Sequence, residues 1–370
     1  MMYMRKDACR FDLLSLGALV TRYDPGDIPL REAKHFDIHV SGGEYNVASN
    51  LSHCFGMKTA VVSAIVRNDF RGDIIEREVR SRGVTGLYKE FINDGMRGPT
   101  HAIVYSNRSH GVRAPEVEYN RANEAAALLK PGDFEWNEIF GDGVRWFHSG
   151  GIFASLSEST SELIIEGMKM AKQANAVTSF DINFRQKLWV ARGGIEIAQK
   201  TYDSILPYVD VLVGNEEDLQ MGLSIKGPEV RKSSKLDPSK FIAMIDDVVC
   251  KYENIHAVAT TLRNVHSADK HSWGAVAWID GKTYQYPQFD ADTGGIDPKF
   301  CIDVYDRVGG GDACASGLFY GLMRGFDPAY AIRIGRESGA HLVTTPGDVL
   351  MAKWPEIKSL CQDGSARIAR

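Results

Sequence analysis

Short apolar runs rich in β-branched residues alternate with segments of helical periodicity along nearly the whole 370-residue chain. The runs predict strands at 13–20, 58–66, 144–149, 176–181, 209–213, 256–261 and 275–279, and amphipathic helices are expected between them, for example over 70–82, 157–174 and 195–206. Runs such as Val209–Val213 are apolar on both faces, which suits a mostly parallel sheet covered by helices on each side. The predicted fold class is therefore α/β, with ligands at the carboxyl ends of the strands.

Two stretches, 22–40 and 98–121, break this alternation. Within the second, Thr100–Tyr105 and Glu116–Tyr119 have the pattern of strands with one polar face. We expect both stretches to form a small sheet that stands off the main one as a lid. The exposed face of such a sheet favours pairing with a second copy, so a homodimer through the lid is expected. Residues 226–240, rich in charge with Gly, Pro and Ser, predict a solvated loop.

The composition argues against several partners and locations. With 43 Lys+Arg and 48 Asp+Glu, the formal charge of -5 gives no general attraction to nucleic acid or to an anionic membrane. No apolar stretch approaches the ~18 residues that span a bilayer. The apolar run near the start is flanked by charges and lacks a small-residue cleavage site, so we interpret it as a buried strand and not a signal peptide. Six cysteines without a C-x-x-C pair are typical of reduced thiols, and we expect a cytoplasmic protein.

The strongest motif is a run of three glycines, Gly309, Gly310 and Gly311, followed by Asp312 at the start of an expected helix. Backbone N–H groups that converge at a helix N-terminus favour an anion. A carboxylate there would repel a resting phosphate, but it suits a group that removes a proton from a hydroxyl while the amides hold charge on a transferring phosphoryl group. Taken alone, the motif also fits a glycine turn with Asp312 as a helix cap.

A second motif places Gly42 and Gly43 before a helix whose first turns carry Asn46 and Asn50. Glycines let a ligand approach the backbone closely, and the Asn46 amide can both donate to and accept from a polyol. Alone this pattern fits a turn and a cap. Together with the distal glycine motif it indicates a ligand site.

These two motifs resemble those of the ribokinase-like (PfkB) carbohydrate kinases, which carry an N-terminal Gly-Gly followed by Asn and a C-terminal Asp-x-x-Gly-Ala-Gly-Asp. The resemblance runs from about Phe11 to Pro346. Three internal stretches, Tyr119–Arg121, Phe147–Gly150 and Ser179–Trp189, are most similar to the 2-keto-3-deoxygluconate kinase branch. The resemblance implies a ribokinase-like three-layer sandwich over residues 11–370, with the lid segments inserted within it.

The resemblance also implies a role for each matching residue. Asp312 would be the general base and Gly309, Gly310 and Gly311 the anion hole. The sugar contacts would come from Gly42, Gly43 and Asn46, and the acid sugar would be bound by Tyr119, Arg121 and Arg185. The pattern of residues agrees, because Tyr119 and Arg121 lie two apart on an expected strand and so share a face. Each arginine alone would also fit a surface or ion-paired residue.

ATP and Mg²⁺ are the cofactors that the resemblance implies. Nucleotide contacts are expected from Asn183, Asn215, Thr261, Arg263, Gly309 and Gly311. The family's Asn-x-x-Glu becomes Asn215–Asp218 here, so Asp218, or Glu217 beside it, is the expected magnesium residue, acting through water. A solvated, acidic helix start is the alternative. Two departures affect the nucleotide side: Gly310 replaces the usual alanine, and the family's Thr-x-Gly-x-x-Gly is lost after Thr261.

The sequence therefore predicts an ATP- and magnesium-dependent kinase of the primary hydroxyl of a small sugar acid, with 2-keto-3-deoxygluconate, converted to its 6-phosphate, as the expected substrate. A fructokinase, or another family kinase acting on a neutral sugar, is the alternative within the class. A catalytically inactive sugar-binding regulator is the alternative from another class, but a pure binder has no need of Asp312 beside a phosphate site. A dinucleotide oxidoreductase is disfavoured because no G-x-G-x-x-G follows a predicted strand.

Overall fold

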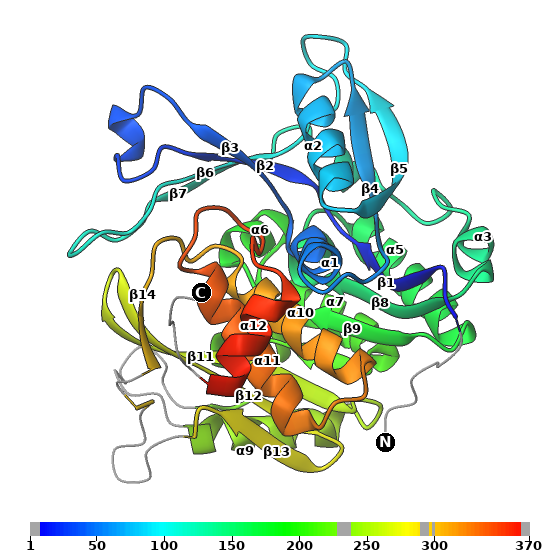
Figure 1. Ribbon diagram of the computed structural model, residues 1–370. Coiled ribbons are helices and arrows are strands. Elements are labelled where there is room, and N and C mark those ends of the chain that lie inside the picture. The colour runs from blue at the N-terminus through cyan, green and yellow to red at the C-terminus, as the bar shows by residue number, and fades with distance from the viewer. Residues whose placement is uncertain (1–7, 228–237, 289–295, 298–299, 364–370) are drawn as a thin grey trace.

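A large mixed sheet runs through the computed structural model, which describes residues 8–227, 238–288, 296–297 and 300–363 (Figure 1). Its ten strands follow the order β13-β12-β11-β10-β9-β8-β1-β4-β5, and β14 pairs with β12. All neighbours from β11 to β5 are parallel, whereas β12, β13 and β14 form an antiparallel edge. The predicted α/β class with a mostly parallel sheet is confirmed.

The strands are β1 Phe11–Leu16, β2 Val20–Asp24, β3 Asp37–Ser41, β4 Thr59–Arg67, β5 Val84–Ile92, β6 Ile103–Ser106, β7 Val117–Asn120, β8 Val144–Gly150, β9 Val177–Asp181, β10 Val211–Val213, β11 Ala257–Ser267, β12 Lys270–Ile279, β13 Lys282–Tyr286 and β14 Cys301–Asp303. The α-helices are α1 Gly43–His53, α2 Phe70–Ser81, α3 Trp136–Gly141, α4 Gly151–Ala154, α5 Glu158–Gln173, α6 Gln186–Arg192, α7 Ile195–Ile205, α8 Glu216–Leu223, α9 Pro238–Lys251, α10 Gly310–Met323, α11 Pro328–Leu342 and α12 Trp354–Asp363. Short 3₁₀ turns lie at Leu30–Glu32, Ala125–Leu128 and Leu206–Tyr208.

Helices cover both faces of the main sheet, and each face has its own apolar core. Successive strand residues point to opposite faces, so Leu13 of β1 belongs to the core that includes α1, α2 and α10–α12, while Leu14 belongs to the core that includes α5, α7 and α9 on the other side. Both leucines are fully buried. This double burial is why the strands read as continuous apolar runs in the sequence.

Two strand predictions need correction. The run 13–20 is not one strand: β1 ends at Leu16 and the chain leaves the main sheet at Gly17, where an added Cβ would lie 2.3 Å from the carboxyl of Glu44. The chain then enters β2, which belongs to a different sheet. In the opposite sense, β11 and β12 extend well beyond the predicted runs as a hairpin. The outer part of β11 has only exposed and half-buried residues, such as Arg263 and Asn264, and the outer part of β12 buries the polar His271 and Ser272, so neither part has an apolar run.

The predicted lid is confirmed as a second sheet, with the order β3-β2-β6-β7. The pair β2–β6 is parallel and the other two pairs are antiparallel. Figure 1 shows this lid sheet projecting from the body of the molecule, with its β6–β7 end near the β11–β12 hairpin. The two meet through Ser109 Oγ, which donates to the Ala268 carbonyl at 2.8 Å, and through the Gly111 N–H, which donates to Asp269 at 3.0 Å.

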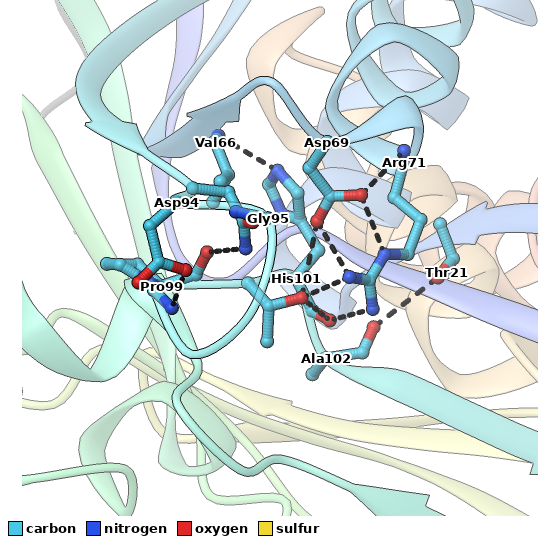
Figure 2. A network of polar contacts seen from close by, with 12 residues as sticks. Thr21, Val66, Asp69, Arg71, Asp94, Gly95, Pro99, His101 and Ala102 are labelled. Atoms are coloured by element: carbon cyan, nitrogen blue, oxygen red, sulfur yellow. Dashed lines mark hydrogen bonds and ion pairs between the residues drawn. The ribbon is translucent and has the colours of Figure 1, made fainter.

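A polar network fixes the base of the lid, where the chain passes from the main sheet into β6 (Figure 2). His101 accepts from the Val66 N–H through Nε2 at 3.1 Å, and its Nδ1 lies 3.3 Å from the Leu19 carbonyl. Arg71 joins this centre by donating to the His101 carbonyl and to Asp69. Burial lowers the pKa of His101 to about 4, so the ring is neutral at pH 7. One ring thus ties β4, the entry to β2 and the entry to β6 together.

The remaining expectations concern surface and location. Most of the predicted loop at 226–240 lies outside the described residues, and α9 begins at Pro238. None of the six cysteines forms a disulfide within the part of the chain that the structure describes. Within the described part of the chain, no helix is both long and apolar enough to cross a bilayer.

Candidate active site

A cavity of about 400 Å³ lies between the carboxyl ends of the main-sheet strands and the lid sheet. Nearly all of the predicted site residues line it: Gly42, Gly43, Asn46, Tyr119, Arg121, Asn183, Arg185, Asn215, Asp218, Thr261, Arg263, Gly309, Gly310, Gly311 and Asp312. Glu217 is the exception, because it is exposed and does not line the cavity. Segments far apart in the sequence thus converge on one pocket, as expected for the carboxyl edge of such a sheet.

The three glycines form the turn into α10, and Gly309 and Gly310 each have their own reason for lacking a side chain. Gly309 is the N-cap with a φ of 79°, and a Cβ there would lie 2.2 Å from the Asp348 carbonyl oxygen. At Gly310 a Cβ would lie 2.8 Å from the Trp273 ring. Gly311 faces open space. The N–H groups of this first turn have no intrahelical acceptors, so the loop presents donors to an anion.

Asp312 stands in the first turn of α10 with its carboxyl group in the cavity. Burial raises the pKa of Asp312 to about 7, against the opposing effect of Asn46, whose Nδ2 donates to Oδ2 at 2.7 Å. The charge of Asp348 raises this pKa further and that of Arg185 lowers it. A carboxylate with a pKa near neutrality is well matched to taking a proton from a hydroxyl group.

The glycine pair at the start of α1 shapes the floor of the pocket. Gly42 has a φ of 145°, and a Cβ there would lie 2.1 Å from the Ala18 carbonyl oxygen, so this position requires glycine. Gly43 faces the site itself, since its Cβ would lie 3.7 Å from Asp312 Oδ1 and 3.8 Å from Asn183 Nδ2. Space for a ligand hydroxyl is therefore left beside Asp312.

The lid contributes Tyr119 from β7 and Arg121 from just past its end. Arg121 Nη1 donates to both carboxylate oxygens of the buried Glu124, at 2.7 and 2.8 Å. Its Nε is buried and has no hydrogen-bond partner among the described residues. The ion pair therefore holds the guanidinium in one orientation while leaving donors for a ligand. Arg185, the N-cap of α6, lines the same cavity as Arg121 but belongs to the main-sheet side, and its side chain is exposed.

Asp218 has structural partners that limit how it can hold a metal. Its Oδ1 accepts from the Phe184 N–H at 2.8 Å and its Oδ2 from the Asn215 N–H at 2.9 Å, and Asn215 in turn caps α8. Burial raises the pKa of Asp218. Among the described residues, no group of three His, Cys, Asp or Glu side chains is arranged to hold a metal ion. The donors present therefore fit a magnesium ion held mainly by nucleotide phosphates and water.

Three arginines face the cavity without a carboxylate partner within 4.0 Å in the described part of the chain: Arg185, Arg263 and Arg307. Arg263 stacks on the Trp273 ring at 5.5 Å. Desolvation, followed by repulsion from Arg307 and Arg185, lowers the pKa of Arg263. Several arginines in one pocket, each without a close carboxylate partner, indicate an anionic ligand, such as a phosphate chain.

Charged and aromatic pocket residues that the sequence did not single out include Arg22, Glu44, Trp273, Arg307 and Asp348. Glu44 is buried, and its carboxyl fills space that Gly17 and Gly150 leave free. Burial raises the pKa of Glu44 to about 8, and burial likewise raises that of Asp181. For Glu44 the pair of glycines before Asn46 was the available signal. No sequence motif marks the other four as ligand-binding residues.

The model of the pfkB family of carbohydrate kinases matches residues 11–250 of this chain. The chain therefore belongs to the pfkB carbohydrate kinase family. Among curated relatives, the 2-dehydro-3-deoxygalactonokinase of Haloferax volcanii is 26% identical over 97% of this chain and 99% of its own length. The 2-dehydro-3-deoxygluconokinase of Thermoproteus tenax is 27% identical over 86% and 84%, and a 5-dehydro-2-deoxygluconokinase of Clostridium perfringens is 24% identical over 93% and 91%.

Solved structures give the same picture of the fold. The 2-dehydro-3-deoxygluconokinase of Thermotoga maritima superposes with a TM-score of 0.81 and 27% identity, over 94% of this chain and 98% of its own. A putative ribokinase II of E. coli in complex with ATP and Mg²⁺ has a TM-score of 0.73 at 16% identity, over 95% and 99%. The ribokinase-like fold with its small second sheet is thus confirmed. The chain is a sugar kinase of this family.

Proposed function

We propose that this sugar kinase transfers the γ-phosphoryl group of ATP to the primary hydroxyl of a small 2-keto-3-deoxy sugar acid, with 2-keto-3-deoxygluconate as the first candidate. One observation carries the choice of an acid: Arg121 from the lid and Arg185 from the main sheet face the same cavity as Asp312. A guanidinium binds a carboxylate through two parallel hydrogen bonds, which a neutral sugar cannot supply. The names of the Haloferax and Thermoproteus relatives agree with this class of substrate.

In this proposal the residues divide the reaction between them. Asp312 takes the proton from the sugar hydroxyl while that oxygen forms a bond to the γ-phosphorus and the bond from the γ-phosphorus to the ADP oxygen breaks. The N–H groups of Gly309–Gly311 stabilise the charge that develops on the phosphoryl oxygens. Arg263 and Arg307 bind the phosphate chain.

Asp218 would hold a magnesium ion through water, and the bound ion would supply positive charge that offsets the charge of the phosphates. Thr261, Asn183 and Asn215 line the same cavity and complete the proposed nucleotide contacts. Glu217 is dropped from the proposal because its side chain lies outside the pocket lining.

An ADP-release assay across a panel of sugars tests the substrate. The panel holds 2-keto-3-deoxygluconate, 2-keto-3-deoxygalactonate, 5-keto-2-deoxygluconate, fructose and ribose. We expect kcat/KM for one of the two 2-keto-3-deoxy acids to exceed that for either neutral sugar at least tenfold. Higher efficiency on fructose or ribose would make this a kinase of neutral sugars. ATP binding without turnover on any sugar would favour a sugar-binding regulator.

A homodimer through the lid sheet, in the cytoplasm, remains part of the proposal. Arg22 of β2 lines the cavity, so Tyr23 points to the other face of the lid, where its ring lies within 6.0 Å of those of Phe36 and Tyr105. The neighbouring Ile38 is 39% exposed. An apolar outer face of this kind favours a partner surface. Sedimentation of the wild type and of Ile38→Lys would test it, with a monomeric wild type counting against the dimer.

A further inference from the structure

Arg22 is a fully buried guanidinium in the middle of the lid strand β2, with a relative exposure of 1%. Its Nη2 donates to Asp306 Oδ2 at 2.5 Å, and its Nε lies 2.6 Å from Asp348 Oδ1. A third carboxylate, Asp24, lies 3.9 Å from Nη1 but is paired more closely with Arg108, at 2.9 Å. Arg22 is therefore committed mainly to Asp306 and Asp348.

These two carboxylates bracket the glycine loop. Asp306 opens the loop, and its second oxygen accepts from the Val308 N–H at 3.1 Å. Asp348 closes it from the far side, since its backbone carbonyl occupies the place that a side chain on Gly309 would take. The loop from Val308 to Gly311 is thus held between two residues that share one guanidinium.

The same contacts set the charge beside the site of phosphoryl transfer. Asp348 acts electrostatically on Asp312, and both line the cavity with Arg22. Without the guanidinium, Asp306 and Asp348 would leave two carboxylates beside a loop that must hold an anion. A buried ion pair is weak evidence for stability, because apolar replacements of such clusters are often tolerated. The position of this cluster therefore favours a role in geometry and charge at the loop.

We propose that Arg22 is a positioning residue of the phosphoryl-transfer step: it fixes the glycine loop from the lid side and neutralises the two carboxylates that flank it. The inference rests on the kinase activity in the proposed function but not on which sugar is taken. Arg22 touches neither substrate in this role. It acts through Asp306 and Asp348 on the donors of Gly309–Gly311.

Steady-state kinetics of Arg22→Ala, Arg22→Lys and Arg108→Met test the proposal, with the melting temperature measured for each. Loss of the charge-assisted hydrogen bond to Asp306 and of the ion pair with Asp348 predicts a kcat about 10- to 100-fold lower in Arg22→Ala, with the sugar KM changed less than about threefold. Free guanidinium at millimolar concentration should restore part of kcat in Arg22→Ala, while sodium chloride at equal ionic strength should not. Arg108→Met is the matched control, because Arg108 belongs to the same cluster but pairs with Asp24 and Tyr305 instead of the loop. Its kcat should stay within about threefold of wild type.

Several outcomes would overturn the proposal. One is a folded Arg22→Ala variant with wild-type kcat, and another is a loss of kcat in Arg108→Met as large as in Arg22→Ala. If Arg22→Ala does not fold, Arg22→Lys decides, since it keeps a charge but not the two-pronged geometry: a tenfold loss of kcat supports the role and a wild-type value refutes it. A wild type without activity on any sugar would instead refute the proposed function, which keeps the two failures apart.

Discussion

The main sheet and the lid sheet meet at one pocket but are held together by different forces. Strands of the main sheet are buried between two apolar cores, and the lid is fixed by charged and polar groups, with Arg22 and His101 at its centre and base. Their contributions to the pocket differ in the same way. The main-sheet side supplies Asp312, the glycine loop and Arg263, whereas the lid supplies Tyr119 and Arg121. We infer that the main sheet carries the chemistry and the nucleotide, and that the lid, through Arg121 together with Arg185 of the main sheet, contributes to the choice of sugar.

Replacing Asp312 should lower kcat more than any other substitution considered, and the loss should be the same for every sugar. Asp312→Asn keeps the shape and the neighbour Asn46 but cannot take a proton, so kcat should fall by ~10² or more while the affinities for ATP and sugar change little. Rates on an acid and on a neutral sugar, with binding measured by calorimetry, check this. Turnover near that of wild type would remove Asp312 from the role of general base.

Replacing the lid arginine should instead separate the sugars. Removing one buried charge-assisted contact costs on the order of 2–3 kcal/mol, so Arg121→Ala should lower kcat/KM on the acid sugar by about 30- to 150-fold. On fructose or ribose the loss should be much smaller. Glu124→Gln is a useful companion, because it frees Arg121 from its ion pair but keeps the guanidinium. Equal losses on acid and neutral sugars in Arg121→Ala would contradict the division between lid and main sheet.

Replacing an arginine proposed to bind the nucleotide phosphates should have a weaker effect, and the effect should fall on the KM for ATP and not on the KM for the sugar. Arg263→Met keeps an unbranched side chain that can pack on Trp273 but removes the charge, and we expect the KM for ATP to rise about tenfold at an unchanged sugar KM. Arg307→Met should act in the same direction. Arg324→Met, an exposed arginine at the end of α10, serves as the control. A shift in sugar KM in place of ATP KM would assign Arg263 to the sugar side of the pocket.

Local pattern was enough to predict the main sheet and most of the site. Apolar runs buried on both faces are visible in the sequence, and glycine motifs mark where a backbone must come close to something, as at Gly42 and Gly309. The lid sheet was also predictable, because the sequences around β6 and β7 alternate polar and apolar residues and so differ from the continuous apolar runs of the main sheet.

The sequence could not show which residues far apart along the chain come into contact in the folded protein. Asp306 opens the C-terminal glycine motif, but Arg22 and Asp348 are ordinary charged residues in their own segments. Only the folded chain shows that the three share one buried cluster. Likewise, only the structure explains why residue 310 is glycine, because the Trp273 ring occupies the space that a side chain there would need. The break at Gly17 depends on the distant Glu44 in the same way. In each case the deciding contact joins residues from different segments that are well separated in the sequence.

The smallest expected effect lies at the base of the lid and appears only with pH. His101 has a pKa of about 4 in the folded protein, below the 6.5 of a free histidine, so between these values the unfolded chain binds the proton that the native state excludes. Its contribution is fully present above pH 6.5 and is lost as the pH falls towards 4, at up to about 1.4 kcal/mol per pH unit. Gln can donate to the Leu19 carbonyl and accept from the Val66 N–H but does not titrate, so the free energy of unfolding of His101→Gln should fall less steeply than that of wild type between pH 6.5 and 5. Urea unfolding at several pH values measures these slopes, with the exposed His35→Gln as control. Equal slopes in His101→Gln and wild type would mean that the lid base is not held by a neutral, buried His101.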